Sequence, residues 1–466
     1  MNNTHNTLIL SILTTIALFL YPSTYLYGEV QTSIPVIQLQ YDLSTLSRDT
    51  FCAGQFTFND GKQTLSFKAK VRHRGATAAG FKKKSYAVKL VDETGQKLDT
   101  SFMGMRSDNY WILDAMAIDK ARMRNRVAMD LWLDFSAKPY YANTEPKMCN
   151  GYRGKFVEVF VNNEYNGLYC LMERIDRKQL KLKKYKTDTI NGQLFKTLNW
   201  TGWTNDGEFK ITEPYINTSS TWMRFEYNYP DPETNLIDWK PLYDAVYFAK
   251  TAKDNEFAAQ AESKYDIPVF IDYCLFTMVL SARDNCGKNL FLSYYNIHQD
   301  SKLLYTPWDL ELSFGRQFDG PAEEPEAKWV WKGLLYQRLE DTYQYYMQLR
   351  KRYAYLRSNF FSAESLKQRF TNYFDLFDQT GAGEREMVKW DGADQIALNF
   401  NEEEQFIYDW IDQRLVYIDD MLDYTYYQSL ENTSQETNST GKILRDGQLY
   451  IIRGEKVYTI TGQVVK

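Results

Sequence analysis

The spacing of apolar and polar residues divides the chain into a β-rich first part and a mainly helical second part. Between residues 34 and 90 apolar and polar positions alternate, and residues 54–71 predict a hairpin around Asn59-Asp60-Gly61. Residues 155–176 give the clearest hairpin pattern, because β-branched and apolar residues alternate on both sides of Asn162-Asn163. The first part is therefore expected to form antiparallel sheet.

Helical spacing first occurs at residues 120–134, where Asp119 is expected to cap the first turn. The remaining predicted helices are 236–251, 267–282, most of 330–375 and most of 402–428, and the remaining strands are 110–114, 289–295 and 303–315. This order predicts an α+β fold with a β-rich lobe, an α-rich lobe and a cleft between them.

The beginning of the chain has the pattern of an export signal. Residues 8–20 are apolar, too few for a membrane span but typical of a signal-peptide core, and a cut is predicted after Gly28. A buried helix is the alternative interpretation. No other stretch is apolar and long enough to cross a membrane, so no span is expected once the signal is removed.

The other end also differs from the middle. Residues 429–440 are polar and predict a flexible linker, and residues 441–466 predict short strands with turns at Asp446-Gly447 and Arg453-Gly454. This tail resembles the C-terminal segments of secreted Bacteroidetes proteins, which implies a secretion or sorting role. The predicted organisation is a signal peptide (1–28), an N-lobe (29–205), a C-lobe (206–428), the linker (429–440) and the tail (441–466).

Composition excludes several classes of function. The 466 residues carry 55 Lys+Arg and 60 Asp+Glu, a net charge of −5, which argues against sequence-independent nucleic-acid binding. Three His residues argue against a multi-histidine metal site and against His-dependent nucleophilic catalysis. The five Cys residues lack CxxC spacing, and their odd number leaves at least one thiol unpaired in the monomer.

Acidic residues in the second part suggest a metal-dependent phosphotransfer site. Asp284 and Asn289 have the Asp-x-x-x-x-Asn spacing of a protein-kinase catalytic loop, and Asp309 follows on a predicted strand. Mg²⁺ prefers a few hard oxygen ligands, which Asn289 and Asp309 offer. The structural alternative is that Asp284 caps a turn and Asp309 pairs with an arginine.

A basic, small-residue loop is the second candidate. Arg74 and Gly75 begin a turn whose backbone N–H groups and charge suit phosphate oxygens, although no Walker loop is present. Among the lysines that follow, Lys84 and Lys89 are both candidates for the phosphate-pairing lysine. The alternative interpretation is a solvated basic face.

Five stretches of the chain carry a family resemblance. They are Arg74-Gly75 with FKKKSYAVKL, WILDAMAIDKARMRNRVAMDLW, VEVFVNNEYNGLYCLMERID, DNCGKNLFLSYY and TPWDLELSFG. In this order they resemble the spore-coat protein H (CotH) kinase-like family, and with the helical segment after 330 they cover most of residues 35–425. The resemblance implies a reduced, atypical protein-kinase fold that uses ATP and Mg²⁺ to phosphorylate secreted proteins.

The same resemblance implies roles for individual residues. Asp284 matches the catalytic Asp, Lys288 accompanies it, and Asp309 matches the metal-binding Asp, with Asn289 as the second metal ligand. Nucleotide binding is implied for the remaining candidates, which are Arg74, Gly75, Lys84, Lys89, Arg124 and Glu173. Two departures from the family pattern are Ala76-Thr77 after Arg-Gly, and Glu311 as the second acid after the Trp.

Three functions remain open at this point. The first is an exported kinase-like phosphotransferase that acts on a secreted or surface protein, outside the cytoplasm or on the cell surface. The second is a non-catalytic surface-binding protein that keeps the fold, and the third is AMP transfer, as in the kinase-like selenoprotein O. Retention of Asp284, Asn289 and Asp309 favours the first.

Overall fold

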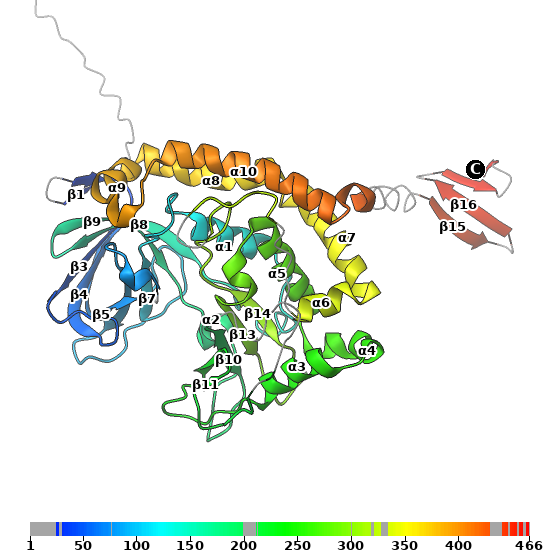
Figure 1. Ribbon diagram of the computed structural model, residues 1–466, viewed down its shortest axis with the longest axis horizontal. Helices are drawn as coiled ribbons and strands as arrows, with labels where there is room; N and C mark the ends of the chain where they lie inside the picture. The colour runs from blue at the N-terminus through cyan, green and yellow to red at the C-terminus, as the bar shows by residue number, and fades with distance from the viewer. Residues whose placement is uncertain are drawn as a thin grey trace, which may run out of the picture.

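The protein is an α+β structure with a sheet-rich first part and a helical second part, as the sequence predicted (Figure 1). A computed structural model describes residues 25–27, 30–75, 77–198, 211, 213–299, 301–317, 321–327, 334–428, 440–445, 448–453, 456–459 and 463–465. The predicted signal core at 8–20, the linker up to residue 439 and Ala76 lie outside the described residues.

Seven strands of the first part close into a barrel in the order β3-β4-β5-β6-β7-β9-β8. The barrel closes because β3 pairs in parallel with β8, from Val36 opposite Glu158 to Leu39 opposite Val161. The strands are β3 (Val36–Tyr41), β4 (Cys52–Asn59), β5 (Thr64–Arg74), β6 (Ser85–Val91), β7 (Tyr110–Asp114), β8 (Gly154–Val161) and β9 (Glu164–Met172).

The prediction of a kinase-like N-lobe is wrong, because the sheet of the first part closes into a barrel. Every second residue of each strand points inward and packs into one apolar core that includes Phe56, Val71, Val88 and Trp111. Both predicted hairpins are confirmed, and Asn162 and Asn163 take the positive φ values (49° and 70°) of a tight turn.

A second, five-stranded sheet lies beside the barrel, in the order β11-β12-β10-β13-β14. Its strands are β10 (Gln193–Thr197), β11 (Thr221–Trp222), β12 (Phe225–Tyr229), β13 (Leu290–Tyr294) and β14 (Leu304–Pro307). Because β10 pairs with both β12 and β13, the predicted boundary at residue 205 falls within the connections of one sheet. The sequence had indicated only the β13–β14 pair.

Helices supply most of the second part. They are α3 (Lys240–Thr251), α4 (Asp254–Lys264), α5 (Ile267–Leu280), α6 (Leu334–Glu340), α7 (Tyr343–Asn359), α8 (Ala363–Gln379), α9 (Ala382–Trp390) and α10 (Phe400–Met421). The long helices α8 and α10 run together along one side of the molecule, and α9 packs on the barrel strand β9 (Figure 1). The sequence did not predict α4, which has only two buried residues.

Helix α1 (Arg124–Phe135) begins four residues later than predicted. Asp119 nevertheless orders its start, because its carboxylate accepts hydrogen bonds from the backbone N–H groups of Met123 (2.8 Å) and Arg124 (2.6 Å). The helix packs into the larger apolar core with α5 and the five-stranded sheet. This places its first turn between the barrel and the second part.

Short elements complete the description. They are β1 (Tyr25–Tyr27), β2 (Val30–Thr32), α2 (Arg177–Leu180), the 3₁₀ turns η1 (Thr77–Gly80), η2 (Arg283–Cys286) and η3 (Ala393–Gln395), and β15 (Thr440–Arg445), β16 (Gln448–Arg453), β17 (Lys456–Thr459) and β18 (Val464–Val465). The last four strands form one antiparallel sheet within the predicted tail, and the predicted turn residues Asp446, Gly447 and Gly454 lie outside the described residues. All five cysteines are free thiols. Within the described ranges, no helix has the length and apolar character that crossing a membrane requires.

Candidate functional site

A cavity of about 290 Å³ lies between one end of the barrel and the five-stranded sheet. The barrel contributes the ends of β5 and β7, the start of β6 and the turn η1, and the opposite wall comes from β10, the loop after η2 and the segment after β14. Six residues predicted from the sequence line it together, namely Arg74, Gly75, Asp284, Lys288, Asn289 and Asp309.

The loop after α5 holds three of these residues close to one another. The Asp284 carboxylate accepts an ion-pair contact from Lys288 Nζ at 2.9 Å, and Asn289 Nδ2 lies 3.5 Å from Asp284 Oδ2. The carbonyl oxygen of Asp284 also accepts hydrogen bonds from the backbone N–H groups of Gly287 and Lys288. The structural alternative for Asp284 therefore holds in part, since this residue closes a tight turn while its carboxylate faces the cavity.

Asn285 ties this loop to the segment that carries Asp309. Its Nδ2 donates to the carbonyl oxygens of Asn289 (3.0 Å) and Trp308 (2.7 Å), and Trp308 N donates to Asn289 O at 3.1 Å. The hydroxyl of Tyr273 on α5 in turn donates to Asn285 O at 2.7 Å. Asp284, Asn289 and Asp309 are thus fixed relative to one another by main-chain contacts.

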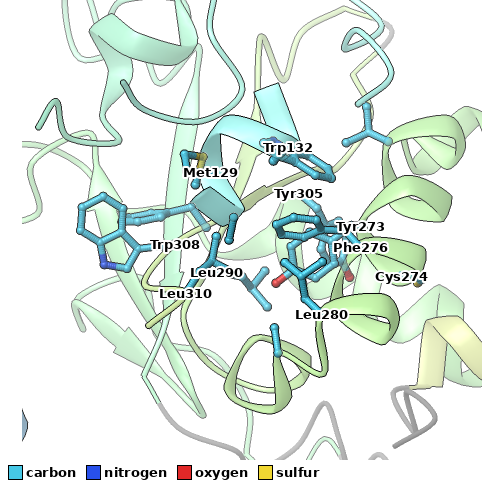
Figure 2. Close-up of a cluster of buried hydrophobic side chains, with 14 of the residues drawn as sticks. Met129, Trp132, Tyr273, Cys274, Phe276, Leu280, Leu290, Tyr305, Trp308 and Leu310 are labelled. Carbon is cyan, nitrogen blue, oxygen red and sulfur yellow. The ribbon is translucent and has the colours of Figure 1, made fainter. Parts of the chain in front are cut away.

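A buried apolar cluster supports the same segment from behind. Figure 2 shows Trp308 and Leu310, the two neighbours of Asp309, beside Leu290 and side chains of α1 and α5. Trp308 also packs edge-on against Tyr152, with ring centroids 4.9 Å apart. Asp309, between these two residues, lines the cavity together with Trp308.

Two of the site residues have strained backbone conformations. Asn289 and Asp309 both have φ of 56°, in the left-handed region that non-glycine residues seldom occupy. Asn and Asp tolerate this region best, and such outliers persist where surrounding contacts hold them. The hydrogen bonds of Asn285 and the packing of Trp308 are the contacts that do so here.

Carboxyl groups gather on one side of the cavity. Burial raises the pKa of Asp309 above its ordinary value and repulsion from Asp114 raises it further, while Arg74 and Lys196 oppose the shift. Burial likewise raises the pKa of Glu311 well above its ordinary value, with Asp114 and Asp309 adding to it. The uncharged forms are favoured because these acids repel one another in a poorly solvated space.

Basic groups face these acids. Lys196 on β10 is the lysine that lines the cavity from the sheet, and burial lowers its pKa although Asp309 attracts its proton. Arg74, the last residue of β5, lies with its guanidinium carbon 5.5 Å from the centre of the Trp308 ring. Gly75 follows with φ of +100°, and a Cβ there would lie 2.8 Å from Ala78 Cβ, so this turn requires glycine.

The other predicted lysines do not reach the cavity. Lys84 Nζ donates to Ala79 O at 2.7 Å, which braces the η1 turn. Lys89 points away on the outer face of β6, with Nζ 4.3 Å from the Phe51 ring centre and 5.2 Å from that of Tyr110. Neither belongs to the cavity lining. In the described lining the lysines are Lys196 and Lys288, so neither lysine that the sequence suggested for the nucleotide lies in this cavity.

Arg124 also lies outside the cavity. It is fully buried, its guanidinium pairs with Asp119 (2.7 Å) and Glu403 (2.6 Å), and Nε donates to Ser313 O. It connects the start of α1 to α10 and to the segment after Asp309. Asn125, the next residue, enters the cavity lining in its place.

Glu173, which was also expected at the nucleotide, lies outside the cavity lining. Its buried carboxylate accepts hydrogen bonds from the backbone N–H groups of Arg106 (2.7 Å) and Arg153 (2.9 Å) and from Gln179 Nε2 (2.9 Å). Burial opposes its ionisation, yet these donors hold the pKa of Glu173 below its ordinary value. The residue fixes the end of β9, and the preceding Met172 lines the cavity.

Two functional candidates, Asp114 and Lys196, were missed from the sequence, and Asn125 was noted only as the neighbour of Arg124 in a family motif. Asp114 ends β7, and its carboxylate accepts hydrogen bonds from Asn125 Nδ2 (3.0 Å) and Ser85 Oγ (3.3 Å). Asn125 Oδ1 accepts from Leu310 N at 3.1 Å, which links α1 to the Asp309 segment. Its position as an acid at the end of an apolar strand is the one local feature of the sequence that could have suggested Asp114.

The donor set fits a hard divalent cation. Across the described residues, no three His, Cys, Asp or Glu side chains lie close enough to hold a metal ion by themselves. Mg²⁺ needs only one or two carboxylates, since water and phosphate oxygens complete its shell. Asp309 with Asn289 supplies such a set, and mutual repulsion among Asp309, Glu311 and Asp114 would be relieved by added positive charge.

The fold and the cavity define an α+β protein in which acidic and basic groups face each other across one enclosed site. Residues 71–418 match the family described as CotH kinase protein, which is well over half of the chain. The chain therefore belongs to the CotH kinase protein family, as its motifs had indicated. A comparison with curated proteins gave no match.

Proposed function

We propose that this cavity binds Mg²⁺-ATP and transfers the γ-phosphoryl group to a hydroxyl of a protein acceptor. Family membership supports a kinase-like phosphotransferase. The observation that carries the proposal is the joint placement of Asp284, Asn289 and Asp309 on one wall of a cavity that also presents Lys196 from that wall and Arg74 from the barrel side. Phosphoryl transfer depends mainly on positioning and charge compensation, and this wall supplies both.

Each residue has a defined task in this reaction. Asp309 and Asn289 would hold Mg²⁺, which supplies positive charge against the phosphate oxygens. Asp284 orients the acceptor hydroxyl and takes its proton at a carboxylate oxygen while the new O–P bond forms and the bond to the ADP oxygen breaks. Lys196 and Arg74 offset the charge of the phosphates.

Lys288 and the Gly75 turn complete the proposed site. The ion pair between Lys288 and Asp284 at 2.9 Å holds the carboxylate in place before an acceptor binds. Gly75 and the 3₁₀ turn η1 (Thr77–Gly80) lie on the barrel side of the cavity, where their backbone N–H groups are proposed to meet phosphate oxygens. Thr77 in this turn lines the cavity, so its hydroxyl is available as a further donor.

Export of this phosphotransferase is part of the proposal. The apolar run at 8–20 and the tail at 441–466 support it, and the acceptor is then a secreted or surface protein. Nucleic acid is not proposed as a partner, because the chain carries a net charge of −5.

Calorimetric titration of Mg²⁺-ATP into the full chain tests nucleotide binding. We expect saturable heat that depends on Mg²⁺ and falls at least tenfold in affinity for Asp309→Asn. Asp375→Asn is the matched control, since Asp375 is exposed on α8 and remote from the lining. A folded wild-type protein that binds no nucleotide would contradict the proposal and favour the non-catalytic surface protein.

A further inference from the structure

A group of cations surrounds two aromatic rings on the outer face of the barrel, beyond the cavity. Arg72, Lys89 and Arg174 lie 4.9, 4.3 and 4.3 Å from the nearest ring centre, over Phe51 for the first two and over Tyr110 for the third. The two rings meet edge-to-face with centroids 6.2 Å apart. These five residues are called the cationic cluster below.

The cluster has an excess of positive charge. Within the described part of the chain, no Asp or Glu forms an ion pair with Arg72, Lys89 or Arg174. Asp176 lies close enough to be influenced by Arg174, but its carboxylate is bound by Arg106 at 2.7 Å.

Two further lysines lie next to the cationic cluster. Lys70 sits opposite Lys89 in the β5–β6 register, and Lys97 adds to the repulsion that Lys89 experiences. Both Lys70 and Lys97 are exposed. Buried Arg124, by contrast, has two carboxylate partners, Asp119 and Glu403. A chain with a net charge of −5 thus keeps one concentrated basic area, which an external anion would complement.

The cluster shares its sheet face with the cavity. Residues 70, 72 and 74 of β5 alternate with the core residues Ala69 and Val71, so all three point outward. Arg74 lines the cavity, and Arg72 lies two residues along the strand, about 7 Å away. Lys89 and Tyr110 are paired on the neighbouring strands, which continues the same face.

We propose that the cationic cluster binds an acidic side chain of the acceptor segment and thereby makes the enzyme select hydroxyls with Asp or Glu nearby. This inference rests on the proposed phosphotransfer function. An extended peptide advances about 3.3 Å per residue, so an acid two to four residues from the reacting hydroxyl spans the separation between the cavity and Arg72 or Lys70. The half-buried rings lower the solvation of the cations and strengthen their attraction for a carboxylate.

The charges in the cavity indicate why a peptide, and not the nucleotide, occupies the cluster. Arg74, Lys196 and Lys288 already face the space where phosphates are proposed to bind, and none of the five cluster residues belongs to the lining. The cluster is therefore a separate subsite, reached along the outer face of β5.

Fluorescence anisotropy with two labelled peptides tests the subsite without any catalytic step. The probes are a heptapeptide with a central Ser and Glu two and three residues away on both sides, and the same peptide with Gln in place of Glu. We expect the full chain to bind the Glu peptide at least tenfold more tightly, with an affinity that falls as salt is raised. The triple variant Arg72→Gln/Lys89→Gln/Arg174→Gln should lose this preference and keep its affinity for Mg²⁺-ATP.

Two further variants make the result decisive. Lys70→Glu/Lys97→Glu changes only exposed side chains, so it retains the fold and should also weaken the Glu peptide. Lys62→Gln, in the exposed β4–β5 turn, is the control and should bind as wild type does. Equal binding of the Glu and Gln peptides, or a triple variant that loses nucleotide affinity and keeps peptide affinity, would overturn the subsite. Loss of nucleotide binding in the wild type would instead contradict the proposed function.

Discussion

Replacement of Glu386 on α9 by Gln should strongly destabilise the protein, because this residue joins the barrel to the helical part. The carboxylate is fully buried and binds Lys83 Nζ at 2.6 Å, Arg122 Nε at 2.7 Å and the backbone N–H of Leu168 at 2.8 Å. Gly167 has no side chain and φ of +108°, and a Cβ there would lie 2.5 Å from Glu386 Oε2. Strand β9 therefore lies so close to α9 that no other side chain has room to replace the contacts of Glu386.

The magnitude follows from what remains after the substitution. Lys83 and Arg122 both contact Oε1, and the backbone N–H of Leu168 donates to Oε2. Gln can keep its oxygen on the two cations only by turning its N–H₂ group toward the Leu168 N–H, and it leaves Lys83 and Arg122 buried without the charge of Glu386. Removal of one partner from a buried ion pair costs about 3–5 kcal/mol. Burial lowers the pKa of Lys83 to about 8 against the pull of Glu386, so Lys83 loses its charge as pH rises above that value. The loss should therefore shrink in alkaline solution, where only Arg122 stays charged.

Urea unfolding followed by tryptophan fluorescence measures this effect. Glu384→Gln is the matched control, because Glu384 lies on the same helix and is exposed, and it should change the unfolding free energy by less than about 0.5 kcal/mol. A loss below about 1 kcal/mol for Glu386→Gln, or one equal to that of the control, would refute the reasoning.

Further predictions concern the cavity. Lys196→Met should weaken Mg²⁺-ATP binding at least tenfold in calorimetry and Lys89→Met should not, because only Lys196 lines the cavity; equal effects would show the corrected lysine assignment to be wrong. Gly75→Ala should cost about 1–2 kcal/mol and weaken nucleotide binding, since φ is +100°, whereas Gly80→Ala, with open space at its Cβ, should do neither. Because the pKa values of Asp309 and Glu311 are raised, protons compete with a cation for these carboxylates. The Mg²⁺-induced rise in Tm should therefore increase as the pH is raised and should depend less on pH in Glu311→Gln; a rise that is independent of pH in the wild type would contradict this.

Local patterns in the sequence were sufficient for the two barrel hairpins, for β13 and β14, and for half of the site. Strand alternation predicted both hairpins, since the side chains that alternate along β4, β5, β8 and β9 are the ones that fill the barrel. The acidic loop was predicted because Asp284 and Asn289 are close in sequence, and Asp309 because it follows a short strand after the next turn. These relations lie within one supersecondary unit.

What the sequence did not reveal depends on contacts between distant segments. Closure of the barrel needs β3 to pair with β8 across more than a hundred residues, and nothing in either strand specifies a parallel partner. Lys196 reaches the cavity only because β10 is placed between β12 and β13. Lys84 and Lys89 were plausible nucleotide lysines by their position in the sequence. In the structure Lys84, just before β6, contacts Ala79 O, and Lys89 on β6 lies over Phe51.

Arg124 and Glu173 illustrate the same limit for charged residues. Each was expected at the nucleotide, and each is instead buried among hydrogen-bond partners that fix a chain segment. Their neighbours Asn125 and Met172 enter the lining. A shift of one residue on a helix or strand changes the face of the side chain, and the sequence did not determine that register.

Transfer of label from ATP tests the central claim most directly. The full chain is incubated with Mg²⁺ and a mixture of Ser-, Thr- and Tyr-containing peptides flanked by Glu, in parallel with γ-³²P-ATP and α-³²P-ATP. The account predicts label in peptide or protein from the γ position only, and at least a hundredfold loss of its rate in Asp284→Asn, as expected when the residue that takes the hydroxyl proton is removed. Label from the α position would indicate AMP transfer, and γ label that is unchanged in Asp284→Asn would contradict the role of this cavity.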